Sequence, residues 1–521
     1  MDKPWPTCVV KSCIGIRLNE HDRCLVHSEP AVQDRYFDGI APNSEVDLRG
    51  TELSASLIDR LLDAARSDGQ RAVLGDADFA EATMETVSFR RVEFTGHAMF
   101  DFANLNDALF EDVRFAGDAA FNQADFARDS MLVNVEFGGI ATFQEALFRN
   151  GVTFDEGTTF MGKAWFEKAG FHGYSYFGGA TFRGTAQFAG AKFADLVSFR
   201  GANFGGAARF HGARFGGVVE FGGVSSAGEV DFQGAEFERV DLLGPISARK
   251  LILESAVFRR NLIVETDAVE VDCTRAVFEE GVSLRVSRAR VKFDQVIPRK
   301  TSAIVSGATA AVISLRETDV VDLMLTDISL SDCRFAGAHH LDKLRLEGIC
   351  TFGSYRRRQV LAEELAWRAD RNVPVGPRRV ADLYRQLRKA QEDSKNEPGA
   401  ADFYYGEMEM RRHSRATPWS ERVILHLYWL VSGYGLRALA TLAVLIAVVS
   451  TSMWLGGFKT TPAFGDTLIY VAQSTVSLET KLASLPKDLT PLGEVLRLVT
   501  RVLGPLLLGL TLLAVRNRVK R

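Results

Sequence analysis

A regular ladder of phenylalanine residues is the feature that most constrains how this chain can fold. Its spacing alternates between six and five residues at Phe182, Phe188, Phe193, Phe199, Phe204, Phe210, Phe215 and Phe221. This alternation matches neither an α-helix, which repeats about every 3.6 residues, nor a strand, which repeats every two. It predicts a chain that turns a corner every five or six residues and sends one large side chain inward from each face. Such a chain is a solenoid.

The ladder extends well beyond this stretch and is accompanied by small residues. Earlier members are Phe89, Phe94, Phe100, Leu105, Phe110, Phe115, Phe121, Phe126, Leu132, Phe137, Phe143 and Phe148, and weaker ones follow at Phe232 and Phe237. A small residue stands two positions before the aromatic at Ala180, Ala191, Ala202 and Ala213. We expect these residues to leave room for a stacked aromatic column. A disordered Phe/Gly-rich tract is the alternative, but such tracts do not keep register over many repeats.

Paired glycines lie between the aromatic positions. They are Gly178-Gly179, Gly205-Gly206 and Gly216-Gly217. Glycine adopts positive φ without steric cost, so these pairs predict the corners of the solenoid.

The segments "ADFAEA", "ANFGGA" and "ARFGGV" resemble the pentapeptide-repeat proteins, whose motif is a small residue, a polar residue and a central Leu or Phe. The resemblance implies a mainly β chain built as a right-handed quadrilateral β-helix with the central residue inside. An extra residue in alternate repeats gives an eleven-residue unit, so two units make a coil of 22 residues. We assign residues 77–237 to this solenoid.

Residues 238–352 keep short apolar runs near a ten-residue interval, at Leu253, Ile263 and Cys273. We interpret them as further, degenerate coils filled by aliphatic side chains. A separate β-domain is the alternative for this segment.

Three of the six cysteines lie within the first thirty residues. Cys8, Cys13, Cys24 and His27 offer three thiolates and one imidazole, a donor set that suits tetrahedral Zn²⁺. We predict a structural zinc-binding module at residues 1–30 and exclude His21 from it. Incidental cysteines are the alternative, and the absence of an apolar signal segment at the front of the chain favours a cytosolic, thiol-reducing setting.

A cap and a helical neck are predicted on either side of the solenoid. Residues 31–76 predict a strand and an amphipathic helix, with Leu53, Leu57, Leu61 and Leu62 on one face and Gly69 after its end. Residues 353–435 are Arg-rich and predict three helices, broken at Pro374, Gly376, Pro377 and Pro398. Leu383, Leu387 and Ala390 are expected to line one face of the second helix. Glu407 and Glu409, which alternate with methionines, are expected on the solvated side of the third.

Residues 436–521 predict a membrane hairpin. The segment 438–457 has no charged residue, and 491–515 is apolar in its second half but carries Glu494, Arg497 and Arg501 in its first. About twenty apolar residues suffice to cross a bilayer as a helix. Arginines before the first span and after the second predict that both termini face the cytoplasm. A pair of buried helices in a protein interior is the alternative.

The loop between the two spans resembles the pore helix of two-span ion channels of the potassium-channel superfamily. In "FGDTLIYVAQSTVSLETKLASLP" the matching residues are Phe464, Asp466, Leu468 and Tyr470, followed by a turn at Ser474, Thr475, Val476 and Ser477. Gly504 and Gly509 match hinge or close-packing positions of the inner helix. The glycines of a potassium filter are missing, and Glu479 could instead supply a ring of carboxylates in an oligomer.

Two functions follow as hypotheses. The first is an oligomeric, ion-channel-like protein of the bacterial inner membrane, a tetramer by resemblance, with a cytosolic sensing or assembly domain. The second is a non-conducting, membrane-tethered scaffold whose solenoid binds a protein partner. No GxSxG, Walker or HExxH motif is present, so we expect no enzyme. A formal net charge of −4 does not favour nucleic-acid binding.

Overall fold

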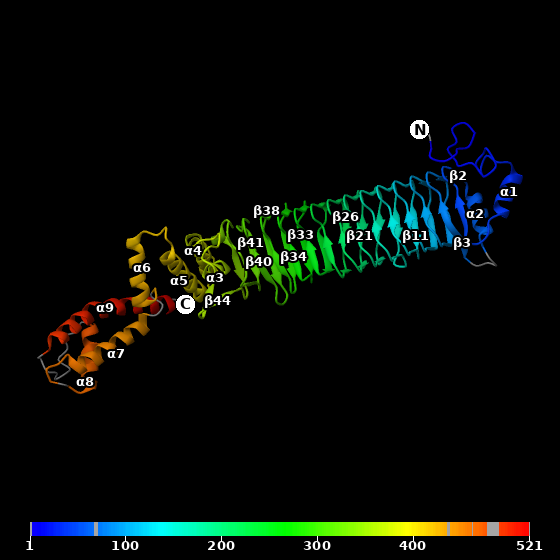
Figure 1. Cartoon of the computed structure of the whole chain (residues 1–521). Coiled ribbons are helices and arrows are strands. Elements are labelled where there is room, and N and C mark those ends of the chain that lie inside the picture. Colours follow the sequence, from blue (N-terminus) through cyan, green and yellow to red (C-terminus); the bar gives the residue numbers. More distant parts are fainter. Residues whose placement is uncertain (1–2, 67–70, 435–437, 461, 477–488, 520–521) are drawn as a thin grey trace. The chain divides into compact units, whose positions relative to one another are not determined.

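The computed structural model describes residues 3–66, 71–434, 438–460, 462–476 and 489–519 (Figure 1). The chain divides into two compact units, Met1–Gly353 and Ser354–Arg521, which are described separately. The first unit is a β-solenoid of about 13 turns with a small N-terminal module. The second unit is helical apart from its first residues.

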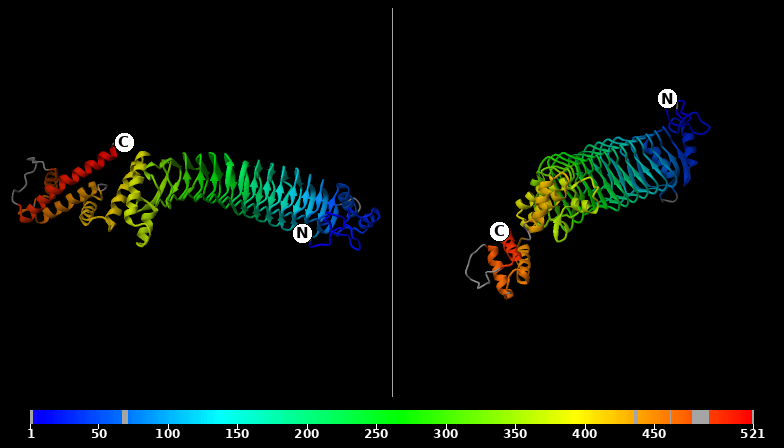
Figure 2. Two further views of the ribbon diagram at one scale, coloured as in Figure 1. Left: turned by 90° about the horizontal axis from the view of Figure 1, so that it is seen from above. Right: turned by 60° about the vertical axis from the view of Figure 1, so that its left-hand side comes forward.

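Each turn of the Phe-rich solenoid contributes four short parallel strands. One turn contains β20 (Thr181–Phe182), β21 (Ala186–Gln187), β22 (Lys192–Phe193) and β23 (Val197–Ser198). The next turn begins at β24 (Asn203–Phe204), in which Phe204 pairs with Phe182, 22 residues earlier. The four-strand turn and its 22-residue length are confirmed. Figure 2 shows the stacked turns in two further views.

The phenylalanine ladder forms the core of the solenoid. The eight ladder residues from Phe182 to Phe221 are buried, as are the alanines that precede them. Rings one turn apart lie face to face: the centroid of Phe188 is 4.7 Å from that of Phe166 and 5.0 Å from that of Phe210. Rings of adjacent faces meet edge-on, as Phe188 does with Phe199 at 5.3 Å. These are the preferred geometries of aromatic pairs, so the predicted aromatic column is confirmed.

The corners of the solenoid fall on a different set of glycines from the predicted pairs. Positive φ recurs every eleven residues at Gly179, Gly190, Gly201, Gly212, Gly223 and Gly234. Gly206 and Gly217 lack positive φ and instead lie against the backbone of the preceding turn. The prediction was therefore right for Gly179 and wrong for Gly205-Gly206 and Gly216-Gly217. Gly206 and Gly217 thus serve close approach between turns, while the corners fall on glycines eleven residues apart, which include single glycines such as Gly190 and the second member of a pair such as Gly179.

The parallel ladder continues past Phe237 with longer strands and shorter turns. β30 (Leu242–Ser247) pairs with β33 (Leu262–Thr266), and β33 pairs with β36 (Val282–Val286). β39 (Ser302–Ser306), β41 (Leu323–Thr326), β43 (Arg345–Glu347) and β44 (Thr351–Tyr355) complete the stack. Leu253 and Cys273 are buried, but Ile263 is half-exposed because its neighbours Leu262 and Val264 point inward.

The N-terminal cap adds the first strands to the stack. It contains α1 (Pro30–Asp38), β1 (Ser44–Asp47), β2 (Glu52–Leu53) and α2 (Ala55–Ala64), followed by β3 (Ala72–Asp78). β1 pairs with β3, and β2 with β4 (Thr83–Met84), so the cap covers the first turn with strands as well as with a helix. Leu53 belongs to β2 rather than to the predicted helix, and Gly69 lies outside the described residues.

The second unit begins with β45 (Arg358–Val360), a strand where the sequence pattern predicted helix. The helices are α3 (Ala362–Ala369), α4 (Pro377–Asp393), α5 (Glu397–His413), α6 (Trp419–Ser432), α7 (Ala438–Gly456), α8 (Phe464–Val476) and α9 (Pro491–Val519). α4 and α5 pack along each other, and Leu383, Leu387 and Ala390 are buried between them, as predicted. α7 and α9 coincide with the two predicted spans.

Besides the strand β45, two further expectations for this unit are not met. Across the helices that the structure describes, none is both long enough and apolar enough to cross a bilayer, so the two spans are not supported. Glu407 and Glu409 are buried rather than solvated, and so are Met408 and Met410. The physical reason is that α5 packs against α4, α6 and β45 and therefore has little solvated surface along this stretch.

Candidate metal centre

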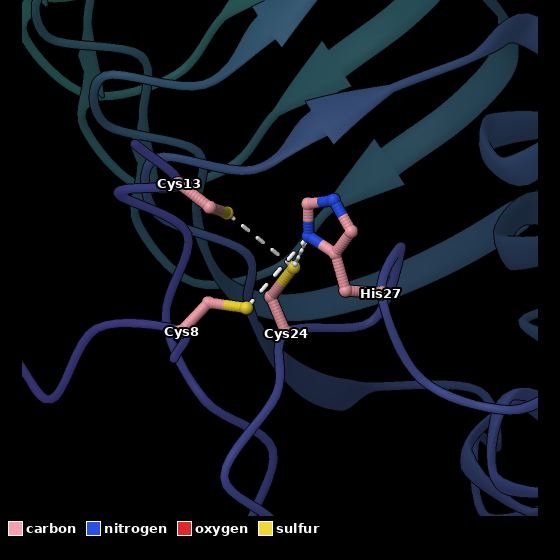
Figure 3. Close-up of side chains that lie close together, drawn as sticks. All are labelled: Cys8, Cys13, Cys24 and His27. Carbon is pink, nitrogen blue, oxygen red and sulfur yellow. Dashed lines mark hydrogen bonds between the residues drawn. The ribbon is translucent and has the colours of Figure 1, made fainter. Parts of the chain in front are cut away.

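The N-terminal module brings the four predicted ligands together through a tight loop. The backbone N–H of Cys8 donates to the carbonyl oxygen of Gly15 at 2.8 Å, and that of Cys13 donates to Val10 at 3.0 Å. A bridge between Thr7 and Ile16 closes the loop. These bonds turn both cysteine side chains towards Cys24 and His27 (Figure 3).

The ligand atoms form a compact group. All four lie within 4.8 Å of one another. Sγ of Cys24 is 3.8 Å from Sγ of Cys13 and 3.2 Å from Nδ1 of His27, and Sγ of Cys8 is 3.7 Å from the same nitrogen (Figure 3). Zinc–sulfur bonds of about 2.3 Å in a tetrahedron place two sulfur atoms about 3.8 Å apart, and a sulfur and a nitrogen about 3.6 Å apart. The spacing therefore fits one tetrahedral ion.

Neighbouring residues hold the ligands in place. Ser28 Oγ donates to the carbonyl oxygen of Cys24 at 2.8 Å, and Gln33 Nε2 donates to Leu25 at 3.0 Å. A Cβ at Gly15 would lie 3.1 Å from Cys24 Cβ and 3.2 Å from Thr51 Oγ1, so a larger residue would crowd the group. The sequence reasoning missed Gly15 and Gln33, and a glycine two positions after Cys13 was the available signal. His21 is not part of the cluster, as predicted.

Burial sets the protonation of two of the three thiols, Cys13 and Cys24, whereas at Cys8 burial is outweighed by hydrogen bonds, which lower the pKa of that thiol. Burial, together with the neighbouring Cys13 and Cys8, raises the pKa of the Cys24 thiol to about 12. Burial also raises the pKa of Cys13. A cation that binds here must displace these protons, because a thiolate is the form that coordinates metal. The arrangement can hold a metal ion through four protein ligands and leaves no open coordination position for substrate, which is typical of a structural site.

The predicted pore-like residues lie mostly on one helix. Phe464, Asp466, Tyr470, Ser474, Thr475 and Val476 all belong to α8, so the turn expected at 474–476 is helical. Phe464 packs edge-on against Trp454 at 5.9 Å, and Tyr470 against Phe458 at 5.7 Å. Ser477 and Glu479 lie outside the described residues.

The two predicted hinge glycines differ in their surroundings. A Cβ at Gly504 would lie 2.5 Å from Cγ2 of Thr475, so glycine allows α9 to approach α8 closely at this point. Gly509 has open space around its Cβ position. Of these two glycines, therefore, only Gly504 has a close-packing role.

Comparison with known proteins agrees with the solenoid. The pentapeptide-repeat family, described as pentapeptide repeats (9 copies), matches residues 166–214 and 177–225. These residues lie within the longer part of the solenoid in which phenylalanine rings stack from turn to turn. The search of curated proteins and that of solved structures return no match. The chain thus contains pentapeptide repeats, and the resemblance stated for the phenylalanine ladder is confirmed.

Proposed function

We propose that this chain is a non-enzymatic scaffold, whose solenoid binds a protein partner while its C-terminal helices associate with a lipid bilayer. The observation that carries this proposal is the large number of exposed apolar side chains on α7 and α9. On α7 they are Val444, Val448 and Leu455, and on α9 they are Leu492, Val495, Leu498, Val502 and Leu506. Soluble monomers rarely expose large contiguous apolar patches, so these exposed side chains call for a covering environment.

The spacing of these residues places them on one side of each helix. Val444, Val448 and Leu455 follow each other at four and seven residues, which is one face of a helix. The opposite faces of α7 and α8 share a core of Val449, Met453 and Val471. The apolar surface is therefore additional to the packing that the helices need among themselves, and a bilayer is the environment that suits it. Arginines flank both helices, and such residues favour the cytoplasmic face of a bacterial inner membrane as the site of association.

The solenoid supplies the rigid surface of the scaffold. Its outer charges pair from turn to turn: Arg285 lies 2.8 Å from Glu265, and Arg209 lies 3.1 Å from Glu229. Such exposed pairs contribute little stability each, about 0–1 kcal/mol. They neutralise part of the charge along the faces, so we expect a partner to be recognised by shape and by local side chains as well as by charge.

We also propose a structural zinc ion in the N-terminal module of the first unit. Lys3 pairs with Glu81, and the guanidinium of Arg49 lies 5.0 Å from the ring of Trp5, so the N-terminal module contacts the first turns. Zinc bound by Cys8, Cys13, Cys24 and His27 would fix a module that has few buried apolar residues of its own. The module then protects the open end of the strand stack.

Co-flotation of the purified full chain with phospholipid vesicles tests the bilayer association. We expect the chain to float with the vesicles and to require detergent for solubility without them. A matched variant in which Val444, Val448 and Leu455 are replaced by Asn should float less while keeping its helical content. A wild-type chain that stays at the bottom of the gradient and is monomeric without detergent would refute the association.

An oligomeric ion channel is the second candidate function. The observation that favours it is the packing of the short helix α8 against both α7 and α9, with Gly504 against Thr475. A single hairpin encloses no pore, so conduction requires several copies, four by the resemblance to two-span channels. Current recorded across planar bilayers tests this candidate, with a Ser474→Ala and Thr475→Val variant as control. Discrete openings that change in the variant support a pore, and silence from inserted protein leaves the scaffold.

A further inference from the structure

Helix α6 (Trp419–Ser432) turns its apolar side outward, which is the reverse of an ordinary surface helix. Trp419, Val423, Leu427 and Leu430 follow each other at four, four and three residues and therefore share one face. All four are exposed, Trp419 to 75% and Leu430 to 69%. Ile424 extends the same surface. This set of five residues is called the outer face of α6.

The opposite face fixes the orientation of the helix. Leu425 is buried in a cluster with Met408 and Tyr434. Nε1 of Trp429 donates to the hydroxyl oxygen of Tyr405 at 3.1 Å, and the guanidinium of Arg412 lies 4.5 Å from the ring of Trp429. These contacts to α5 prevent the helix from rolling its apolar side inward.

Charge is distributed unequally around α6. Its single carboxylate, Glu421, pairs with Arg411 of α5 and is half-buried, so the outer face carries no acidic group. Arg415, just before the helix, is exposed, and Arg422 lies in its first turns. Within the described part of the chain, neither Arg415 nor Arg422 has an ion-pair partner. Arg415 is thus available beside the apolar surface, and the half-buried Arg422, whose Nε is enclosed without a hydrogen-bond partner among the described residues, lies at its edge.

We propose that α6 lies in the headgroup region of an anionic lipid bilayer, with its outer face inserted and Arg415 and Arg422 beside lipid phosphates. An amphipathic helix with bulky apolar residues and basic neighbours binds this interface, and tryptophan prefers the same depth. Apart from Ser420, His426 and the indole N–H groups of Trp419 and Trp429, the described exposed side chains of α6 offer no hydrogen-bonding group, which suits acyl chains and the interfacial headgroups better than a protein surface. This inference adds the lipid class to the bilayer association proposed above and rests on it.

Fluorescence of Trp419 in the full chain tests the inference. Vesicles of phosphatidylcholine alone and of phosphatidylcholine with phosphatidylglycerol are prepared with brominated acyl chains, which quench tryptophan at the membrane interface. The signal of Trp419 is obtained by subtracting a Trp419→Phe variant. We expect quenching of Trp419 that is stronger on the anionic vesicles and that weakens with added salt.

Two variants give the expected magnitudes. Replacing Arg415 or Arg422 by Gln should lower the apparent affinity for anionic vesicles about fivefold each, since a basic residue near an anionic surface contributes about 1 kcal/mol. Replacing both Leu427 and Leu430 by Glu should abolish the quenching, and both residues are exposed, so the fold should persist. Arg385→Gln on α4, which is 60% exposed and paired with Asp382, is the matched control and should change nothing.

The outcomes separate this inference from the bilayer association. If the chain floats with vesicles but Trp419 is not quenched, the role of α6 is refuted while the association stands. If quenching is equal on neutral and anionic vesicles, the anionic preference is refuted. If the chain does not float, both are refuted. If Leu427→Glu turns a dimer into a monomer in detergent, a second copy covers the outer face and the lipid proposal is wrong.

Discussion

Replacing Gly212 with alanine isolates the energetic cost of one left-handed corner in the solenoid. Gly212 has φ +62°, and no atom lies within 4 Å of its Cβ position, so alanine meets no steric obstacle there. An L-residue in this conformation costs about 1–2 kcal/mol. Alanine also restricts the unfolded chain, which offsets about 0.4–1 kcal/mol. The net expectation is a loss of about 1 kcal/mol of local stability.

Two further substitutions serve as matched controls. Lys168 occupies the equivalent corner two turns earlier with φ +56°. Lys168→Gly should therefore increase local stability by about as much as Gly212→Ala decreases it. Its exposed ion pair with Glu145 contributes little. Gly206 is not at a left-handed corner, but its Cβ would lie 2.9 Å from the carbonyl oxygen of Gly184. Gly206→Ala should therefore cost more than Gly212→Ala, because backbone of the neighbouring turn must move.

Hydrogen exchange followed by mass spectrometry on the full chain measures these changes turn by turn. A change of 1 kcal/mol corresponds to about a fivefold change in the exchange rate of peptides around the altered corner. Gly212→Ala should accelerate exchange there, and Lys168→Gly should slow it at its own corner. If Gly212→Ala leaves exchange unchanged while Lys168→Gly accelerates it, the corners are not left-handed and the reasoning fails.

Three other substitutions test the core, the metal site and the neck. Phe188→Ala removes a ring stacked on both sides and should lower the stability of its turn by about 3–5 kcal/mol. Phe188→Leu should lower it less. The same exchange experiment measures both, and equal losses of stability would contradict the aromatic column. Cys24→Ser should reduce bound zinc from one ion per chain to none, and His21→Ala should leave the zinc content unchanged. Mass spectrometry of the native protein measures the zinc content. Retention of zinc by Cys24→Ser would contradict the ligand set. Burial alone would raise the pKa of Glu409, but Arg412 and other cations lower it below its ordinary 4.5. The stability that this carboxylate contributes is therefore present above pH 4.5, and it is lost as the pH falls through the lowered pKa. Glu409→Gln should therefore flatten the acid side of the stability profile of the helical unit, followed by exchange in α5, and an unchanged profile would contradict the contribution of Glu409.

The solenoid could be predicted from the sequence because one physical requirement repeats at every turn. Each face needs one large inward side chain, and the ladder from Phe182 to Phe221 displays that requirement directly. The corner positions could not be predicted as well, because they are not always glycine: Phe102 and Lys168 adopt positive φ where Gly190 and Gly212 do so later. Sequence therefore marks the core of each turn more clearly than its corners.

The helical unit was harder to predict because its packing depends on contacts between distant segments. Glu407 and Glu409 were expected to be solvated, yet both are buried on α5. Arg368 of α3 lies 3.5 Å from Glu409, and Arg388 of α4 donates a hydrogen bond of 3.1 Å to Glu407. A carboxylate can be buried once such partners arrive from other helices. The Cys3His cluster was predictable because cysteine spacing alone carries the signal.

Hydrogen exchange of the full chain with and without phospholipid vesicles tests the central claim most directly, since it reports on both units at once. The account predicts that amides of α6, α7 and α9 become protected when vesicles are added, while those of the solenoid keep the rates that they have in detergent. Unchanged exchange in all three helices, from protein whose solenoid remains protected, would contradict the claim that this chain is a scaffold held at a bilayer.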